Sequence, residues 1–220
     1  MWSHVENDLK ELLSQRLYKD LLPDPVYHNF VLNAGIDPRR PPEKLSQSLR
    51  DKLAMQAVVR ARVIVRTIEQ SGGINGDGAS VKVQKGGIFL RFWDSELSSR
   101  KGVWWFSSRL IEECKREAGS YPIQRLSWLR DKLAICHDWS GMDKLDVCTL
   151  SEDEEIIAIV GKGTPQPIWS RSAAGRTPPG IIEYTRSLGK YFVGGVPQMV
   201  LPFLPRTQTG VDISAYLGKR

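Results

Sequence analysis

Residues 87–93, Gly-Ile-Phe-Leu-Arg-Phe-Trp, mark the point at which the pattern of the chain changes from helical to extended. Val81 and Val83 precede this stretch at a spacing of two, which is typical of a strand. Gln84-Lys85-Gly86-Gly87 connects Val83 to the apolar residues that begin at Ile88, and its composition favours a turn. The two runs therefore predict a hairpin over 81–93, and the fold class follows from what lies on either side of it.

Before this hairpin the apolar spacing is helical. Residues 5–21 repeat leucine and valine at intervals of three and four, and residues 43–70 form a second, longer helical pattern that ends almost wholly apolar. Proline-rich segments at 21–25 and 36–42 interrupt the helices. We therefore expect a helical N-terminal region over residues 1–75.

After the hairpin, short strands dominate. Further helices are predicted at 109–118 and 122–137. Strands are predicted at 103–106, 145–150 and 155–160, and near 181–184, 190–193 and 198–203. This order favours an α+β fold, with N-terminal helices followed by a mostly antiparallel, strongly twisted sheet. Residues 76–220 are expected to form the α+β domain that carries the ligand site.

The distribution of charge indicates the kind of ligand. Eight basic and two acidic residues lie within 161–220, so this part of the chain holds the whole net charge of +6. Such a bias suits a small phosphate-bearing ligand, with nucleic acid as the alternative partner and a plain solvated face as the simplest explanation. No apolar run is long enough to cross a membrane. The acidic N-terminal stretch does not resemble a signal peptide, which favours a cytoplasmic protein or a secreted effector that acts inside a cell.

Several common kinds of catalytic site have no support. Cys114, Cys136 and Cys148 are odd in number and widely spaced, so we expect buried thiols and no metal site. The HExxH and GxSxG motifs are absent, which disfavours zinc proteases and hydrolases of the nucleophile-elbow type. The acidic run at 152–155 is expected to be a solvated turn.

Three segments remain as candidates for binding. Arg91 lies among apolar strand residues; unless it occupies an exposed position, it needs an anionic partner such as phosphate. Ser107 ends the aromatic strand that holds Trp104 and Trp105, and it either contacts a ligand hydroxyl or caps the next helix. The third segment is 189–202, in which Gly194 and Gly195 let the backbone approach a ligand closely and Gln198 begins a strand. Its alternative interpretation is a structural turn.

The order of these segments resembles the ADP-ribosyltransferase-like superfamily. An arginine on an early strand, a serine on an aromatic strand and Gly-Gly-x-x-Gln-x-x-Leu-Pro follow one another over residues 81–205. The last element is most similar to NAD-glycohydrolase toxins of that superfamily. Met199 and Val200 stand where the better-known transferases have a nearby glutamate, which favours hydrolysis over transfer to protein.

The resemblance implies a role for each candidate residue. NAD would be the substrate, and the nicotinamide–ribose bond would be broken by hydrolysis or ADP-ribosyl transfer. Arg91 would hold the pyrophosphate, Ser107 would contact the ribose, and Gln198 would stabilise the oxocarbenium-like cation. Trp104, Trp105 or Tyr191 would stack on nicotinamide, close to the backbone of Gly194 and Gly195.

Two other classes of function stay open. A nucleic-acid-binding protein would use the basic C-terminal third, where aromatic residues alternate with lysine and arginine. A non-enzymatic interaction protein would use the N-terminal helices to bind a partner.

Overall fold

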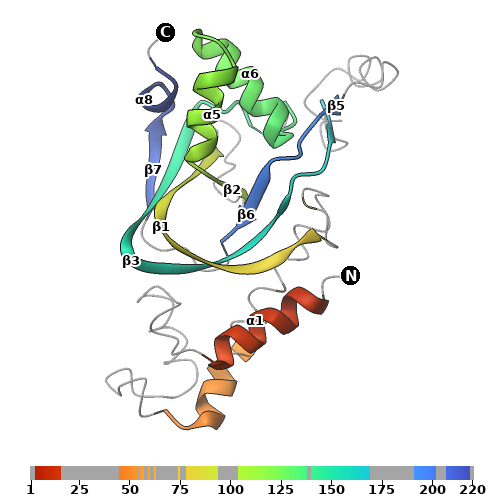
Figure 1. Cartoon of the computed structure of the whole chain (residues 1–220), viewed down its shortest axis with the longest axis vertical. Helices are drawn as coiled ribbons and strands as arrows, with labels where there is room; N and C mark the ends of the chain where they lie inside the picture. The colour runs from red at the N-terminus through yellow and green to blue at the C-terminus, as the bar shows by residue number, and fades with distance from the viewer. Residues whose placement is uncertain are drawn as a thin grey trace.

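The structure of the chain is a computed structural model. It describes residues 3–15, 45–53, 55–56, 59, 62, 74, 78–93, 104–137, 140–168, 191–201 and 207–218. An α+β fold with an antiparallel sheet is confirmed (Figure 1). The predicted strand near 181–184, and most of the helix predicted over 43–70, lie outside the described residues.

The sheet is built mainly from two long, bent strands. Strand β1 (Ser80–Trp93) pairs antiparallel with β3 (Lys144–Lys162) along its whole length, from Ser80 opposite Val160 to Trp93 opposite Lys144. The predicted hairpin over 81–93 is therefore wrong. Gly86 and Gly87 have φ angles of +58° and +108°, and they bend β1 without reversing it, so both of its limbs keep β3 as their partner.

Two short strands close the bent pair into a ring. Strand β2 (Trp104–Ser107) pairs with β1 on one side and with β6 (Pro197–Val200) on the other, and β6 pairs with β3. Because β3 also pairs with β1, the four strands form a small closed barrel, and β7 (Thr207–Asp212) adds to β3 outside the ring. A short separate pair, β4 (Gln166–Pro167) with β5 (Tyr191–Phe192), lies beside it.

Alternating side chains divide the core between the inside and the outside of the barrel. The cluster inside the barrel takes side chains from all four ring strands: Phe89, Trp105, Cys148, Leu150, Ile156, Ala158 and Met199, together with Leu201. Outward-facing residues of the same strands, such as Leu90 and Phe106, pack under the helices. Burial of these apolar faces is the main source of stability.

Helices cover two regions of the outer surface (Figure 1). Helices α5 (Arg109–Glu117), α6 (Pro122–Leu133) and α8 (Ser214–Leu217) pack over one end. Helix α1 (Ser3–Gln15) lies at the other end, where Val5 joins Ile159 and Val200 in a third cluster. Among the described residues, no helix is long and apolar enough to cross a membrane.

The helix predicted over 122–137 is shorter than expected and differs in its exposed face. It ends at Leu133 because Ala134 adopts a left-handed conformation with φ of +51°. The guanidinium of the buried Arg130 then donates to the carbonyls of Ile135, Cys136 and Ser140 at 3.1, 3.2 and 2.9 Å. The apolar residues of 122–137 recur at helical spacing and predict Ile123 on the buried face, but Ile123 is 72% exposed.

Candidate functional site

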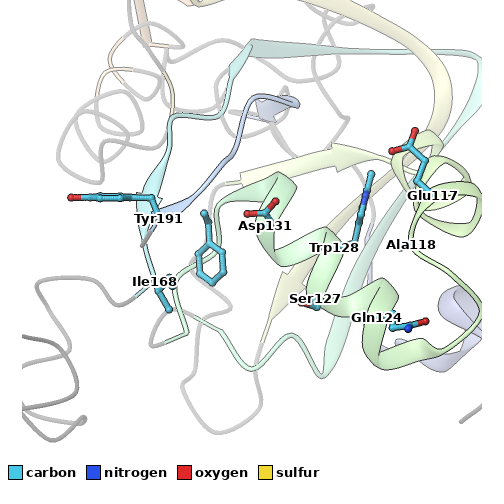
Figure 2. Close-up of a pocket in the computed structure, with 9 residues that line it drawn as sticks. Glu117, Ala118, Gln124, Ser127, Trp128, Asp131, Ile168 and Tyr191 are labelled. Atoms are coloured by element: carbon cyan, nitrogen blue, oxygen red, sulfur yellow. The ribbon is translucent and has the colours of Figure 1, made fainter. Parts of the chain in front are cut away.

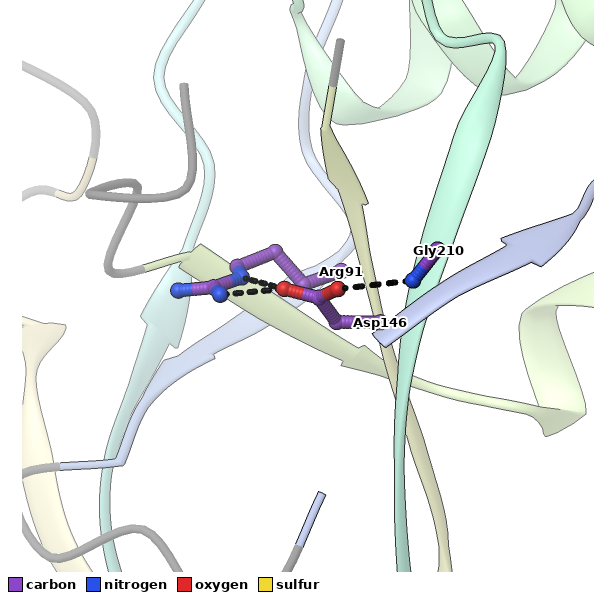
Figure 3. A network of polar contacts seen from close by, with 3 residues as sticks. All are labelled: Arg91, Asp146 and Gly210. Atoms are coloured by element: carbon purple, nitrogen blue, oxygen red, sulfur yellow. Dashed lines mark hydrogen bonds and ion pairs between the residues drawn. The ribbon is translucent and has the colours of Figure 1, made fainter. Parts of the chain in front are cut away.

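Arg91 has its anionic partner within the chain (Figure 3). Its Nε donates to Oδ2 of Asp146 at 3.1 Å, and its Nη2 forms a second bond to the same oxygen. Gly210 on β7 donates its N–H to the other oxygen of Asp146 at 3.4 Å. The side chain of Arg91 is 11% exposed and its guanidinium lies 4.9 Å from the centre of the Trp105 ring. The pair therefore links β1, β2, β3 and β7.

The tryptophan side chains of the aromatic strand β2 pack in the hydrophobic core. Trp105 is 1% exposed inside the barrel, whereas Trp104 is half-buried against the cluster under α1. Oγ of Ser107 accepts the N–H of Arg109, the first residue of α5, at 3.3 Å, whereas the cap position itself is occupied by Ser108.

Gln198 fastens β6 to α6. Its side chain is 5% exposed, and its Nε2 donates to the carbonyl of Leu133 at 2.8 Å. A side chain at Gly163 would collide with this amide, so the glycine makes room for it. Gln198 points out of the barrel, because its neighbour Met199 points in with Trp105 and Arg91. The structure thus brings Arg91 and Trp105 together but places Gln198 on the opposite face of the sheet.

The glycine pair holds β5 and the residues after it against α6. Gly194, with φ of +64°, donates to the carbonyl of Asp131 at 2.9 Å, and Gly195, with φ of +87°, donates to the carbonyl of Gly163 at 2.9 Å. A Cβ at Gly194 would lie 2.9 Å from the oxygen of Gly163, so this close approach requires glycine. The N–H of Val193 adds a bond of 3.0 Å to Oδ1 of Asp131.

An open groove of about 810 Å³ runs along α6 between this segment and the end of α5 (Figure 2). Its floor is the exposed stripe of α6, spaced as one helix face, and its walls come from α5 and from the β4–β5 region. It is lined by Gln124, Ser127, Trp128 and Asp131 of α6, by Glu117 and Ala118, and by Ile168, Tyr191 and Phe192. We call it the α6 groove.

The α6 groove combines aromatic faces with carboxylates. Trp128, Tyr191 and Phe192 offer ring faces or edges, and the ring of His137 packs edge-on against Phe192 with centroids 5.5 Å apart. Glu117 and Asp131 supply acceptors for hydroxyl groups or a positive charge. Lys132 places its Nζ 5.5 Å from the centre of the Trp128 ring, which adds a cation at the border. Such a lining suits a ligand with flat rings and hydroxyl groups.

Of the candidates predicted from the sequence, Tyr191 lines this groove, and Gly194 and Gly195 shape its wall. Sequence reasoning missed Trp128 and Asp131, because residues 122–137 were interpreted by their apolar face alone, and it included Phe192 only as part of the segment 189–202. The signal was present on the other face, where Gln124, Ser127, Trp128 and Asp131 recur at helical spacing.

Burial of the thiols was predicted and is confirmed. Cys114, Cys136 and Cys148 are free and buried. Burial raises the pKa of Cys114 to about 11 and that of Cys148 to about 12, so neither is an activated nucleophile. Burial also lowers the pKa of Arg130. The solvated turn expected at 152–155 is not a turn, because these residues belong to β3; residues 152–154 are exposed and Glu155 is half-buried.

The basic C-terminal third is mostly beyond the described residues. Of its eight basic residues, Lys162 alone falls within the described ranges, where it is exposed on β3. Comparison with known proteins finds no matching family model, no similar curated protein and no similar solved structure.

Proposed function

We propose that the chain binds NAD in the α6 groove and breaks the bond between nicotinamide and ribose. The observation that carries the proposal is the lining of the groove, which Tyr191 shares with two more aromatic side chains and two carboxylates. Flat rings of a dinucleotide stack on aromatic side chains, and carboxylates bind ribose hydroxyls. The resemblance of residues 81–205 to NAD glycohydrolases points to the same substrate.

The reaction would be a hydrolysis. The C–N bond breaks, nicotinamide leaves with the bonding electron pair, and water adds to the ribosyl carbon and releases a proton. The carboxylate of Asp131 would stabilise the positive charge that develops on the ribose. Lys132 at the border of the groove would face the pyrophosphate. Such an enzyme would act in the cytoplasm, as a resident protein or as a secreted effector that enters a cell, and the reaction needs no metal ion.

In this proposal Gln198 and Arg91 act as positioning residues. Gln198 bonds to Leu133, two residues beyond Asp131 on α6, and so holds the floor of the groove to β6. Arg91 fixes the barrel on which α6 rests, through Asp146 and Trp105. Their loss is expected to lower stability together with activity.

The test is release of nicotinamide from NAD, followed by chromatography. Wild type is expected to release it, and Trp128→Ala and Tyr191→Ala are expected to lower kcat/KM about tenfold or more, since one stacking contact contributes about 1–3 kcal/mol. Ile123→Ala is the control, because Ile123 lies on α6, is 72% exposed and does not line the groove. No release by wild type, or equal rates in all variants, would refute the proposal.

A further inference from the structure

Asp131 occupies the middle of the α6 groove and is held in place from the opposite wall. Figure 2 shows it between Tyr191 and Trp128. Its Oδ1 accepts the N–H of Val193 at 3.0 Å, and its main-chain carbonyl accepts the N–H of Gly194 at 2.9 Å. Among the residues that the structure describes, no hydrogen bond reaches its other carboxylate oxygen, Oδ2. A fixed, half-buried negative charge therefore faces the groove.

Like the carboxylate of Asp131, the aromatic side chains around it favour a positively charged ligand. A ring face attracts a cation through its quadrupole, and the chain already places Lys132 over the ring of Trp128. Glu117 adds a second carboxylate at the α5 end of the groove. An organic cation suits this lining, because it gains from the charge of the carboxylates and from the faces of the aromatic rings.

We infer that the α6 groove selects a flat organic cation over its neutral counterpart, and that Asp131 determines this specificity. For NAD this inference rests on the proposed function. It means that the groove prefers the oxidised form, whose nicotinamide ring carries a positive charge, to the reduced form, whose ring is neutral. The recognised chemistry is a ring nitrogen that bears a permanent positive charge.

Binding of small probes tests the inference separately from catalysis. Titration calorimetry would compare the N-methylnicotinamide cation with neutral nicotinamide, and oxidised with reduced NAD. Wild type is expected to bind each cation about tenfold more tightly than its neutral partner, as for a partly desolvated cation on aromatic rings. Equal affinities within both pairs would overturn the inference. Tetramethylammonium is the third probe. If it binds as tightly as N-methylnicotinamide, the groove recognises round cations equally well, and the inference that it selects a flat cation is overturned.

Asp131→Asn isolates the charge, because an amide oxygen can still accept the N–H of Val193. The variant is expected to bind cation and neutral probe within about twofold of each other. Glu112→Gln is the matched control, since it removes a carboxylate from α5 at an exposed ion pair with Lys115, away from the groove. A preference that persists in Asp131→Asn would overturn the role of this residue. The wild-type comparison remains decisive if the variant does not fold.

The two proposals fail in different ways. Charge-selective binding without nicotinamide release would refute the enzyme and keep the inference. Release of nicotinamide with no preference between the probes would refute the inference and keep the enzyme.

Discussion

At the scale of single residues, the Arg91–Asp146 pair is costly to disturb. Asp146 is 1% exposed and Arg91 is 11% exposed, so removal of either partner leaves a buried charge without compensation. Asp146→Ala is expected to lower the free energy of unfolding by about 3–5 kcal/mol. Urea unfolding followed by tryptophan fluorescence would measure the change.

The matched double variant tests the cause. Replacement of both partners, as in Arg91→Met with Asp146→Leu, removes both charges together and is expected to recover most of the loss. Glu112→Ala, which breaks the exposed pair with Lys115, should change stability by less than about 1 kcal/mol. If the double variant were no more stable than Asp146→Ala, the loss would come from packing and not from an uncompensated charge.

Cys148 makes stability depend on alkaline pH. Burial, with a smaller contribution from the carboxylate of Glu154, raises its pKa to about 12 in the folded chain. In the unfolded chain a thiol ionises near pH 8.5, so the unfolded state loses its proton first. The contribution of Cys148 to stability is therefore complete below about pH 8 and is lost as pH rises toward the folded value.

Comparison with Cys148→Ala isolates this effect. Between pH 8 and pH 10, the free energy of unfolding of wild type should fall by about 2 kcal/mol more than that of the variant. Urea unfolding at the two pH values measures the difference. Parallel curves for the two proteins would mean that the thiol titrates normally in the folded state.

At the scale of elements, the bend of β1 depends on its glycines. Gly87 has φ of +108°, a conformation that a side chain strains, although no clash would block a Cβ there. Gly87→Ala is expected to cost about 1–3 kcal/mol in urea unfolding. Lys82→Ala, at an exposed position of the same strand, should change stability by about 0.5 kcal/mol at most. A neutral Gly87→Ala would show that the strand can bend elsewhere.

The same strand shows how far sequence reasoning reaches. Glycines at 86–87 indicated a departure from regular extended structure, and they make one. Whether the chain reverses or merely bends depends on β3, which lies more than fifty residues away and pairs with both limbs. A local pattern contains no information on such a partner. The strands at 145–150 and 155–160 were therefore predicted separately, although they are two limbs of β3.

The sequence predicted what some single residues of the candidate site need chemically, but not which residues the fold brings together. The need of Arg91 for an anion followed from its apolar neighbours, but the anion is Asp146 of the same chain. Gln198 and Arg91 were expected in one site, yet closure of the barrel places their side chains on opposite faces of the sheet. The Gly-Gly motif predicted close approach of the backbone, and that approach is to Asp131 and Gly163.

At the scale of the whole molecule, ring closure joins four strands into one cooperative unit. Each of β1, β2, β3 and β6 has two neighbours within the ring, so none can separate without breaking at least two sets of hydrogen bonds. Strand β7 pairs with β3 alone among the described strands. We expect the amides of Leu90, Trp105, Ile159 and Met199 to exchange hydrogen with the global free energy of unfolding, and those of β7 to exchange through smaller openings.

Trp105→Ala tests this cooperativity from inside the barrel. The ring of Trp105 fills the interior that all four strands share, and its loss is expected to cost about 3–5 kcal/mol. If the barrel opens as a unit, protection of the slowest amides must fall by the same amount in β1, β2, β3 and β6. If protection fell in β2 and β6 while β1 and β3 kept theirs, the long strand pair would be stable without its closing strands. The barrel would then open at the β2–β6 seam, and Gln198, which ties β6 to α6, would lie on the part that opens.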